Sequence, residues 1–301
     1  MAEKKRPKIG LALGSGGARG WCHIGILREL DAMGLKPDVI SGASMGALVG
    51  AIYAGGALDE LENWAQELTA RDFFGMLDIK PSSGGLVEGG EILSVIRRLV
   101  EHDRIQDLPI PLAVVATDMA TGRDVWMREG DLAEAVRASV ALPGMISPYR
   151  IEGRWFLDGG LTNPLPVTAC RILGAEVVIA ANPNGRFDGT FWEERKEELP
   201  TLSRTWSERL PHLPDVLKDF LESEREEEPR PQYLDVLAAS IDIMTDGIRR
   251  AKLAGDPPHV LLDAHLSKLS VIDFHRASEA IEEGRRVVKD SADVIARAAK
   301  L

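Results

Sequence analysis

The sequence predicts an α/β protein built on a mainly parallel sheet with helices on its faces. The first fifty-odd residues contain the succession of strand, tight turn and helix twice, and the same rhythm continues, less clearly, to residue 182. Glycine is plentiful at 29 residues and aromatic residues are sparse at 5%, which suits tight turns and close helix–strand packing. Repeated strand–helix units favour parallel pairing, because each helix carries the chain back to begin the next strand at the same edge.

The first unit is a strand, a glycine-rich turn and a helix. KIGLALG (8–14) is a short apolar run ending in glycine, as expected of a buried strand and its turn. From residue 18 to about residue 33 the pattern is helical, with Ile24, Leu27 and Leu30 on one face. The second unit repeats this order, with a strand at DVISG (38–42) and a helix from Ser44 to the Gly55-Gly56 stop.

The later elements follow the same alternation with more irregular spacing. In chain order they are a helix near Glu91, strands at 110–118 and 124–127, a helix at 131–139, two short strands around the Glu152-Gly153 turn, a helix at 164–173 and a strand at 176–182. We therefore expect a catalytic core over residues 8–185.

Beyond residue 185 the composition changes. Residues 186–231 are rich in charge and proline, and two interpretations stay open: a lid or membrane-facing cap that uses Trp192 and Trp206, or a solvated helical hairpin. Residues 232–301 predict a C-terminal extension packed on the core, with a long helix at 234–254, a strand at HVLLD and a final helix from about Phe274. An earlier apolar segment, around Phe73, Phe74, Met76 and Leu77, is expected to be either a flap over a groove or core packing followed by a loop.

Charge and cysteine content narrow the function. The formal net charge is −11 and the pI is near 5.2, which disfavours nucleic acid and does not favour anionic membranes. The two cysteines, Cys22 and Cys170, stand alone and fit a reducing compartment. No apolar run approaches the length of a membrane span, and the N-terminal stretch IGLALGSGG is too short and too glycine-rich for a signal-peptide core. A cytoplasmic protein is the expectation, with transient contact to a membrane surface still open.

The segment Gly42-Ala43-Ser44-Met45-Gly46 fits the GxSxG nucleophile elbow. The small residues two positions either side of Ser44 allow a sharp turn between strand and helix that presents the hydroxyl. The N-terminus of the following helix favours negative charge at the same place. The alternative is a purely structural serine that caps the helix after a tight turn. The strand–turn–helix context favours the nucleophile elbow.

The glycine-rich segment GSGGARG (14–20) also connects a strand to a helix. Its backbone N–H groups can form a concave anion site. A dinucleotide-binding loop would need glycine where Arg19 stands, and a P-loop would need Gly-Lys-Ser/Thr. An oxyanion hole fits better, because the turn lies one strand–helix unit before Ser44 and parallel strands bring both turns to one edge. A packing turn is the alternative.

Asp158-Gly159-Gly160 ends the predicted strand RWFLD. Asp-Gly is a common turn signal, but a serine nucleophile needs a group that takes its proton. A shielded carboxylate can do this directly. A Ser–His–Asp triad with His259 or His275 satisfies the order of α/β-hydrolases, yet only one strand and one helix precede the elbow here, where those folds place several strands.

Together, SGGARG (15–20), GASMG (42–46) and DGG (158–160) resemble the motifs GGGxRG, GxSxG and DG[GA] of the patatin-like phospholipases. The proline-bearing segment ASVALPGMISP and the later NPLP are also similar, and the resemblance covers roughly residues 8 to 180. One departure is Ser15, where that family usually has its first glycine.

The resemblance implies a three-layer α/β/α sandwich and a Ser–Asp dyad that uses no metal and no cofactor. By position, Ser44 would be the nucleophile and Asp158 the proton acceptor. The Gly16 and Gly17 N–H groups, with Arg19, would form or support the oxyanion hole; the remaining motif glycines are Gly42, Gly46, Gly159 and Gly160. The implied substrate is a lipid or phospholipid ester, hydrolysed through an acyl-enzyme.

Three alternative functions stay open: two would use the same catalytic residues, and one would leave them without a catalytic role. An acyltransferase or a thioesterase would employ the same dyad and pass the acyl group elsewhere or accept it from sulfur. A lipid-binding regulatory protein would have a degenerate site, and the three intact motifs argue against that class. The head group, the acyl-chain preference and the oligomeric state are not encoded in any pattern that we recognise.

Overall fold

The computed structural model describes residues 6–69, 87–186 and 233–300. The segment around Phe73–Leu77 and, apart from Arg186, the charged insertion predicted at 186–231 lie outside these residues. The proposed flap and lid therefore stay predictions, as does the division of the chain into three parts.

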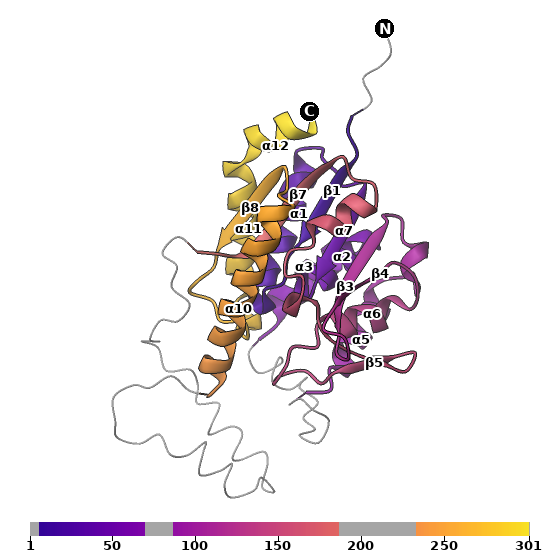
Figure 1. Cartoon of the computed structure of the whole chain (residues 1–301). Helices are drawn as coiled ribbons and strands as arrows, with labels where there is room; N and C mark the ends of the chain where they lie inside the picture. Colours follow the sequence, from indigo (N-terminus) through magenta and orange to yellow (C-terminus); the bar gives the residue numbers. More distant parts are fainter. Residues whose placement is uncertain (1–5, 70–86, 187–232, 301) are drawn as a thin grey trace, which may run out of the picture.

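The molecule is a three-layer α/β/α sandwich, as predicted, around one eight-stranded sheet (Figure 1). Five strands run parallel in the order β3-β2-β1-β7-β8, and three further strands are antiparallel, with β6 and β4 paired to β3 and β5 paired to β6. The strands are β1 (Ile9–Leu13), β2 (Val39–Ala43), β3 (Leu112–Asp118), β4 (Asp124–Met127), β5 (Tyr149–Ile151), β6 (Arg154–Asp158), β7 (Val177–Gly185) and β8 (Val260–His265).

Both faces of the sheet are covered, because successive side chains of each buried strand point to opposite sides. On β1, Leu11 packs into the larger core and Ala12 into the smaller one on the other face. The larger core contains α1 (Cys22–Ala32), α2 (Met45–Ala54), α3 (Leu58–Glu67), α5 (Gly90–Leu99), α6 (Leu132–Ser139), α11 (Ala277–Asp290) and α12 (Ala292–Ala299). The smaller core contains α7 (Val167–Ile172) and the end of α10 (Tyr233–Gly255).

The C-terminal region contributes a strand to the sheet as well as helices around it. β8 pairs in parallel with β7, from Ile179 opposite Val260 onward, so that β7 is an interior strand. The final helical region is divided into the short 3-10 turn η5 (Phe274–Arg276), α11 and α12, which part at Ser291. α3 is an element that the sequence analysis did not predict.

Within the described residues, no helix combines the length and the apolar character needed to cross a lipid bilayer.

Candidate active site

Ser44 lies on a strained turn between β2 and α2. Its backbone φ is 55° and ψ is −125°, a conformation that residues with a side chain rarely adopt. The two motif glycines make the turn possible: a Cβ on Gly42 would lie 2.4 Å from the carbonyl oxygen of Gly46, and a Cβ on Gly46 would lie 2.2 Å from that of Leu13. Glycine is therefore needed on both sides of the serine, because backbone atoms approach too closely to leave room for a Cβ.

Ser139, at the end of α6, forms a hydrogen bond with the backbone of this turn. Its Oγ accepts a 2.9 Å hydrogen bond from the Ser44 N–H and donates a 2.5 Å bond to the Val115 carbonyl. The side chain is fully buried, so this contact satisfies an amide that would otherwise be left unpaired. Sequence reasoning placed Ser139 at a helix end and gave it no role, because its partners are distant in the chain.

Asp158 ends β6 and reaches Ser44 from the neighbouring antiparallel part of the sheet. β6 pairs with β3, with Asp158 opposite Ala116. The Ser44 hydroxyl donates a 2.6 Å hydrogen bond to Asp158 Oδ2, and the Gly160 N–H donates a 2.7 Å bond to Oδ1. The structure thus brings together the two residues, 114 positions apart, that the sequence singled out.

Burial sets the protonation of this carboxylate. Asp158 is 2% exposed, and removal from water raises its pKa from 3.8 to about 6, although the hydrogen bonds from Ser44 and Gly160 act in the opposite direction. A carboxylate with a raised pKa is a stronger base than an exposed aspartate, and it is still largely ionised at neutral pH. The pair can therefore move a proton from the serine hydroxyl.

The loop between β1 and the 3-10 turn η1 (Gly17–Trp21) presents two free amides. Its neighbouring amides are occupied: Ser15 N donates to Pro164 O at 2.8 Å, and Ala18 N donates to Val271 O at 2.9 Å. The N–H groups of Gly16 and Gly17, in contrast, have no hydrogen-bond partner among the described residues. Both glycines line the same cavity as Ser44 and Asp158. Unpaired backbone donors beside a serine hydroxyl are the arrangement that stabilises an oxyanion.

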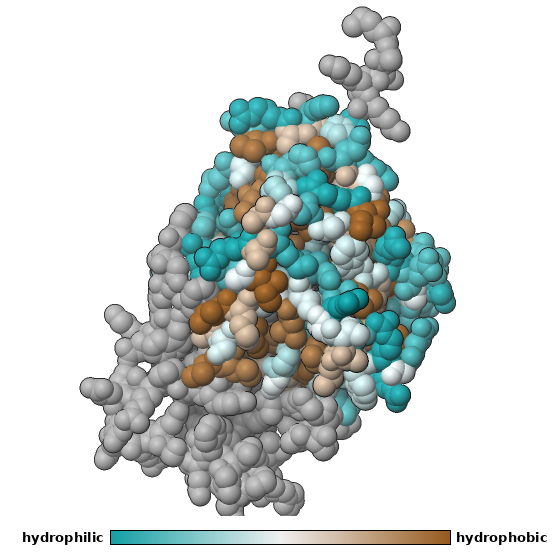
Figure 2. Space-filling model, viewed as in Figure 1, coloured by the Kyte–Doolittle hydropathy of each residue, from teal (hydrophilic) through white to brown (hydrophobic). Residues whose placement is uncertain are grey.

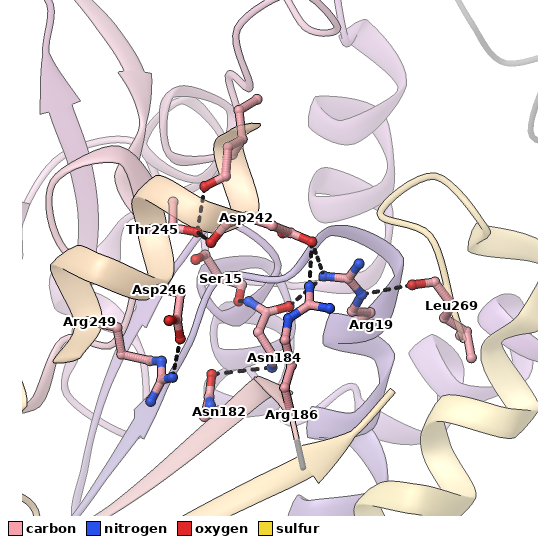
Figure 3. Close-up of polar contacts among 11 residues, drawn as sticks. Ser15, Arg19, Asn182, Asn184, Arg186, Asp242, Thr245, Asp246, Arg249 and Leu269 are labelled. Atoms are coloured by element: carbon pink, nitrogen blue, oxygen red, sulfur yellow. Dashed lines mark hydrogen bonds and ion pairs between the residues drawn. The ribbon is translucent and has the colours of Figure 1, made fainter. Parts of the chain in front are cut away.

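Arg19 belongs to the same loop, but its side chain turns away from the cavity. The guanidinium is buried and donates to Leu269 O (2.8 Å), Asn184 Oδ1 (2.9 Å) and Asp242 Oδ2 (2.8 Å), as Figure 3 shows. It does not line the cavity that contains Ser44. The structure therefore places the Arg19 side chain behind the loop and outside the lining of the cavity.

The cavity above Ser44 has a volume of about 230 Å³ and is mostly apolar. Its wall comes from α2, α3, α5, the 140–146 segment, α10 and the 270–274 segment; the apolar lining includes Met45, Leu48, Trp64, Ile92, Val95, Val140, Leu142, Met145, Ile146, Leu237, Ile241 and Phe274. A polar corner is formed by Ser15, Asn184, Asp242 and Thr245. Such a space suits an apolar chain attached to a polar reacting group.

Apolar surface also gathers on the outside of α10, in the lower left of the view in Figure 2. Val236, Ile243 and Met244 are each more than half exposed there. The lining of the cavity and this surface therefore share one helix.

No histidine among the described residues lines the cavity. His23 is buried in α1, where its Nε2 bonds Gly14 O at 2.8 Å and burial lowers its pKa to about 4. His259 accepts a hydrogen bond from Val178 N at the start of β8, and His275 lies in η5. The geometry gives no support to a Ser–His–Asp triad.

Comparisons with known proteins bear on the family of the chain. The model of the family described as patatin-like phospholipase matches residues 11–171. An uncharacterized NTE family protein of Mycobacterium tuberculosis is 32% identical over 95% of this chain and 92% of its own length. The human patatin-like phospholipase domain-containing protein 6 is 34% identical over 57% of this chain and 13% of its own. The crystal structure of VipD from Legionella pneumophila covers 98% of this chain and 81% of its own at 14% identity, with a TM-score of 0.38.

Proposed function

Because the chain belongs to the patatin-like phospholipase family, we propose that it is a lipid acyl hydrolase that cleaves carboxylic esters through a Ser44–Asp158 dyad. One observation carries the proposal: the 2.6 Å hydrogen bond from Ser44 Oγ to Asp158 Oδ2 at the base of an apolar cavity. Phospholipase A, lysophospholipase and simple esterase reactions share this chemistry, and all break an ester of a carboxylic acid.

In the first step Ser44 Oγ attacks the carbonyl carbon of the ester, and its proton passes to Asp158 Oδ2. The carbonyl oxygen becomes an oxyanion that accepts hydrogen bonds from the Gly16 and Gly17 amides. The C–O bond to the alcohol then breaks, and the alcohol leaves with the proton from Asp158. The acyl group is now an ester of Ser44.

In the second step a water molecule attacks the acyl-enzyme while Asp158 takes one of its protons. The tetrahedral oxyanion again accepts hydrogen bonds from the two glycine amides. Its collapse breaks the bond to Ser44 Oγ, which recovers the proton from Asp158 and releases the fatty acid. Loss of one such oxyanion donor costs on the order of 10²–10³ in rate in serine hydrolases.

The shape and lining of the cavity support an acyl chain as the part of the substrate that enters it. Its apolar residues come from both halves of the chain, from Leu48 on α2 to Leu237 on α10. Burying a methylene group there stabilises the complex by about 0.8 kcal/mol. The polar corner lies on the α10 side, where the alcohol portion of an ester would meet it.

The test is intact-mass analysis after treatment with a fluorophosphonate, with detergent present. We expect one adduct on the wild-type protein, no adduct on Ser44→Ala and slowed labelling of Asp158→Asn, because the serine is reactive only when a base takes its proton. Ser41→Ala is the matched control: Ser41 is a buried serine of β2 whose hydroxyl bonds Pro166 O at 2.7 Å, away from the cavity. Its labelling should equal that of the wild type.

A folded wild-type protein that forms no adduct would overturn the proposal and leave a lipid-binding protein as the better account. If the adduct forms, ester hydrolysis with and without added acceptor alcohols distinguishes a hydrolase from an acyltransferase. A matched oxygen ester and thioester of the same acid distinguish an esterase from a thioesterase. Release of free acid from the oxygen ester, unaffected by the acceptor, is the outcome that we expect.

A further inference from the structure

Two buried arginines share one carboxylate behind the glycine-rich segment 14–20, which carries the Gly16 and Gly17 amides. We call this segment the oxyanion loop. Arg19 Nη1 lies 2.8 Å from Asp242 Oδ2, and Arg186 Nη2 lies 2.7 Å from the same oxygen. The side chains of all three residues are at most 8% exposed. They come from three distant segments: η1 in the N-terminal part, the end of β7 and the middle of α10 (Figure 3).

The hydrogen bonds of this cluster end on the loop that carries the two free amides. Asn184, which accepts from Arg19, donates a 2.9 Å bond from Nδ2 to the Ser15 carbonyl. Arg19 also donates from Nε to Leu269 O, and Val271, two residues later, accepts from the Ala18 amide. Residues 15, 18 and 19 are thus held on both sides of the Gly16-Gly17 pair.

The charge balance of the cluster depends on Asp242. Two guanidinium groups that face each other in a buried place repel, and each loses most of its hydration. Burial and the nearby Arg19 both lower the pKa of Arg186. The charges of Asp242 and Asp246 act against this, and Asp242 also accepts a hydrogen bond from Arg186. Removing one partner of such a buried group leaves an uncompensated charge, so the arginines would move toward water. For Arg19 such a movement displaces the loop to which it belongs.

We propose that Asp242 is a positioning residue for the oxyanion loop. It fixes Arg19, and through Arg19 it holds the Gly16 and Gly17 amides toward Ser44. Helix α10, which lies outside the matched residues 11–171, is then a working part of the active site. This inference rests on the proposed acyl-transfer function, because the position of those amides affects a rate only if an oxyanion forms.

Helix α10 also lines the cavity, so a variant on this helix could disturb either the cavity wall or the position of the oxyanion loop. Ile241, next to Asp242, and Leu237, five residues before it, contribute to the apolar wall, and Asp242 itself belongs to the polar corner. A change that only damages this wall would weaken the binding of a probe. A change that displaces the loop would slow the chemical step after binding, because the oxyanion donors act in the transition state.

The experiment compares Asp242→Asn with Asp246→Asn in fluorophosphonate labelling kinetics. Asp246 lies one turn further along α10, where it pairs with Arg249 and Arg250 of its own helix. We expect Asp242→Asn to lower the maximal labelling rate constant by on the order of 10², as for a misplaced catalytic group, with the half-saturating probe concentration changed by no more than about twofold. Asp246→Asn should match the wild type in both quantities.

Arg19→Gln and the Arg19→Gln/Asp242→Asn double variant test whether Asp242 acts through Arg19. If it does, the double variant is about as slow as the slower single variant, because both changes interrupt one connection. Should Asp242→Asn fail to fold, Arg186→Gln/Asp242→Asn avoids the facing like charges and is expected to show the same slow labelling.

The possible outcomes distinguish the positioning role of Asp242 from the proposed function. An Asp242→Asn protein that labels at the wild-type rate, or one in which only the half-saturating concentration rises, would overturn the positioning role and leave the proposed hydrolase intact. Independent, multiplicative effects of the Arg19 and Asp242 substitutions would overturn it as well. A folded wild-type protein that takes no label would instead remove the proposed function, and the inference with it.

Discussion

At the scale of single residues, Asp158 combines two opposing influences. Its two oxygens accept short hydrogen bonds from Ser44 and Gly160, which favour the ionised form. Its burial favours the neutral form more strongly, so that the pKa lies near 6. A carboxylate with such a pKa can both accept a proton and return it within one catalytic cycle.

The first prediction in this light concerns pH. Only ionised Asp158 can accept the Ser44 proton, so the labelling rate should rise with pH and level off above a midpoint near 6. An unperturbed aspartate would give a midpoint near 3.8. The measurement is the fluorophosphonate rate constant from about pH 5 to about pH 8. In Asp158→Asn the remaining reaction should lack this inflection, and a wild-type rate that is level across that range would contradict the assignment.

The site residues that sequence alone identified belong to short motifs of adjacent positions. Ser44 and its flanking glycines form a turn that spacing reveals, and Asp158 stands in a similarly short motif. Asn184 and Asp242 carry no such signal, because each acts on a partner far along the chain; Arg19 and Asp242 are 223 positions apart. Ser139 lies within the ASVALPGMISP segment, but that pattern assigns it no role. For Arg19 itself the resemblance gave an association with the oxyanion hole, and only the structure shows that its side chain lies behind the loop.

At the scale of elements, α1 and α11 cross with their backbones in contact. A Cβ on Gly25 of α1 would lie 1.9 Å from the Ile281 carbonyl oxygen, and a Cβ on Gly284 of α11 would lie 2.0 Å from that of Cys22. α1 follows the loop through the short η1 turn, and His23 of α1 bonds Gly14 O, so this helix is tied to the loop. This crossing therefore contributes to the placement of the loop.

Gly25→Ala should destabilise the protein by about 1–3 kcal/mol, since the added methyl group meets backbone atoms that have no rotamer to change. Gly247→Ala on α10 is the opposite case, because no atom lies within 4 Å of its Cβ position. There alanine should stabilise the helix by up to about 1 kcal/mol. Urea unfolding of the two variants measures both effects. Equal free energies of unfolding for the two proteins would show that the α1–α11 contact is not as tight as described.

Element prediction was accurate where one period dominates and failed where it changes. The strands β1, β2 and β3 were found because they are short apolar runs between turns. The sequence pattern from residue 274 onward looked like a single helix, yet the chain forms η5, α11 and α12 with a break at Ser291. Ser291 has φ −103° and ψ 5°, outside the helical region, and serine has no sequence signature that distinguishes such a break from a helix interior.

At the scale of the whole molecule, the region that matches the family model is not a closed structural unit. The match ends at residue 171, before β7 begins at Val177. β7 lies between β1 and β8, so the strand that carries the oxyanion loop depends on two strands beyond the match. α10 adds a wall of the cavity and Asp242, and the 269–274 segment supplies carbonyl partners to Arg19, Ala18 and Trp21.

Two truncations test this dependence. A chain that ends at Gly185 loses β8, α10 and α11, which exposes one edge of β7 and opens the cavity; we expect it to lack a cooperative unfolding transition and a reactive serine. A chain that ends at Asp290 loses only α12, whose residues do not line the cavity. It should unfold at lower urea concentration, because the buried Ile295 is lost, yet still form the Ser44 adduct. If the fragment ending at Gly185 unfolds cooperatively and labels at the full-length rate, the catalytic unit ends with β7 and α10 is an accessory to it.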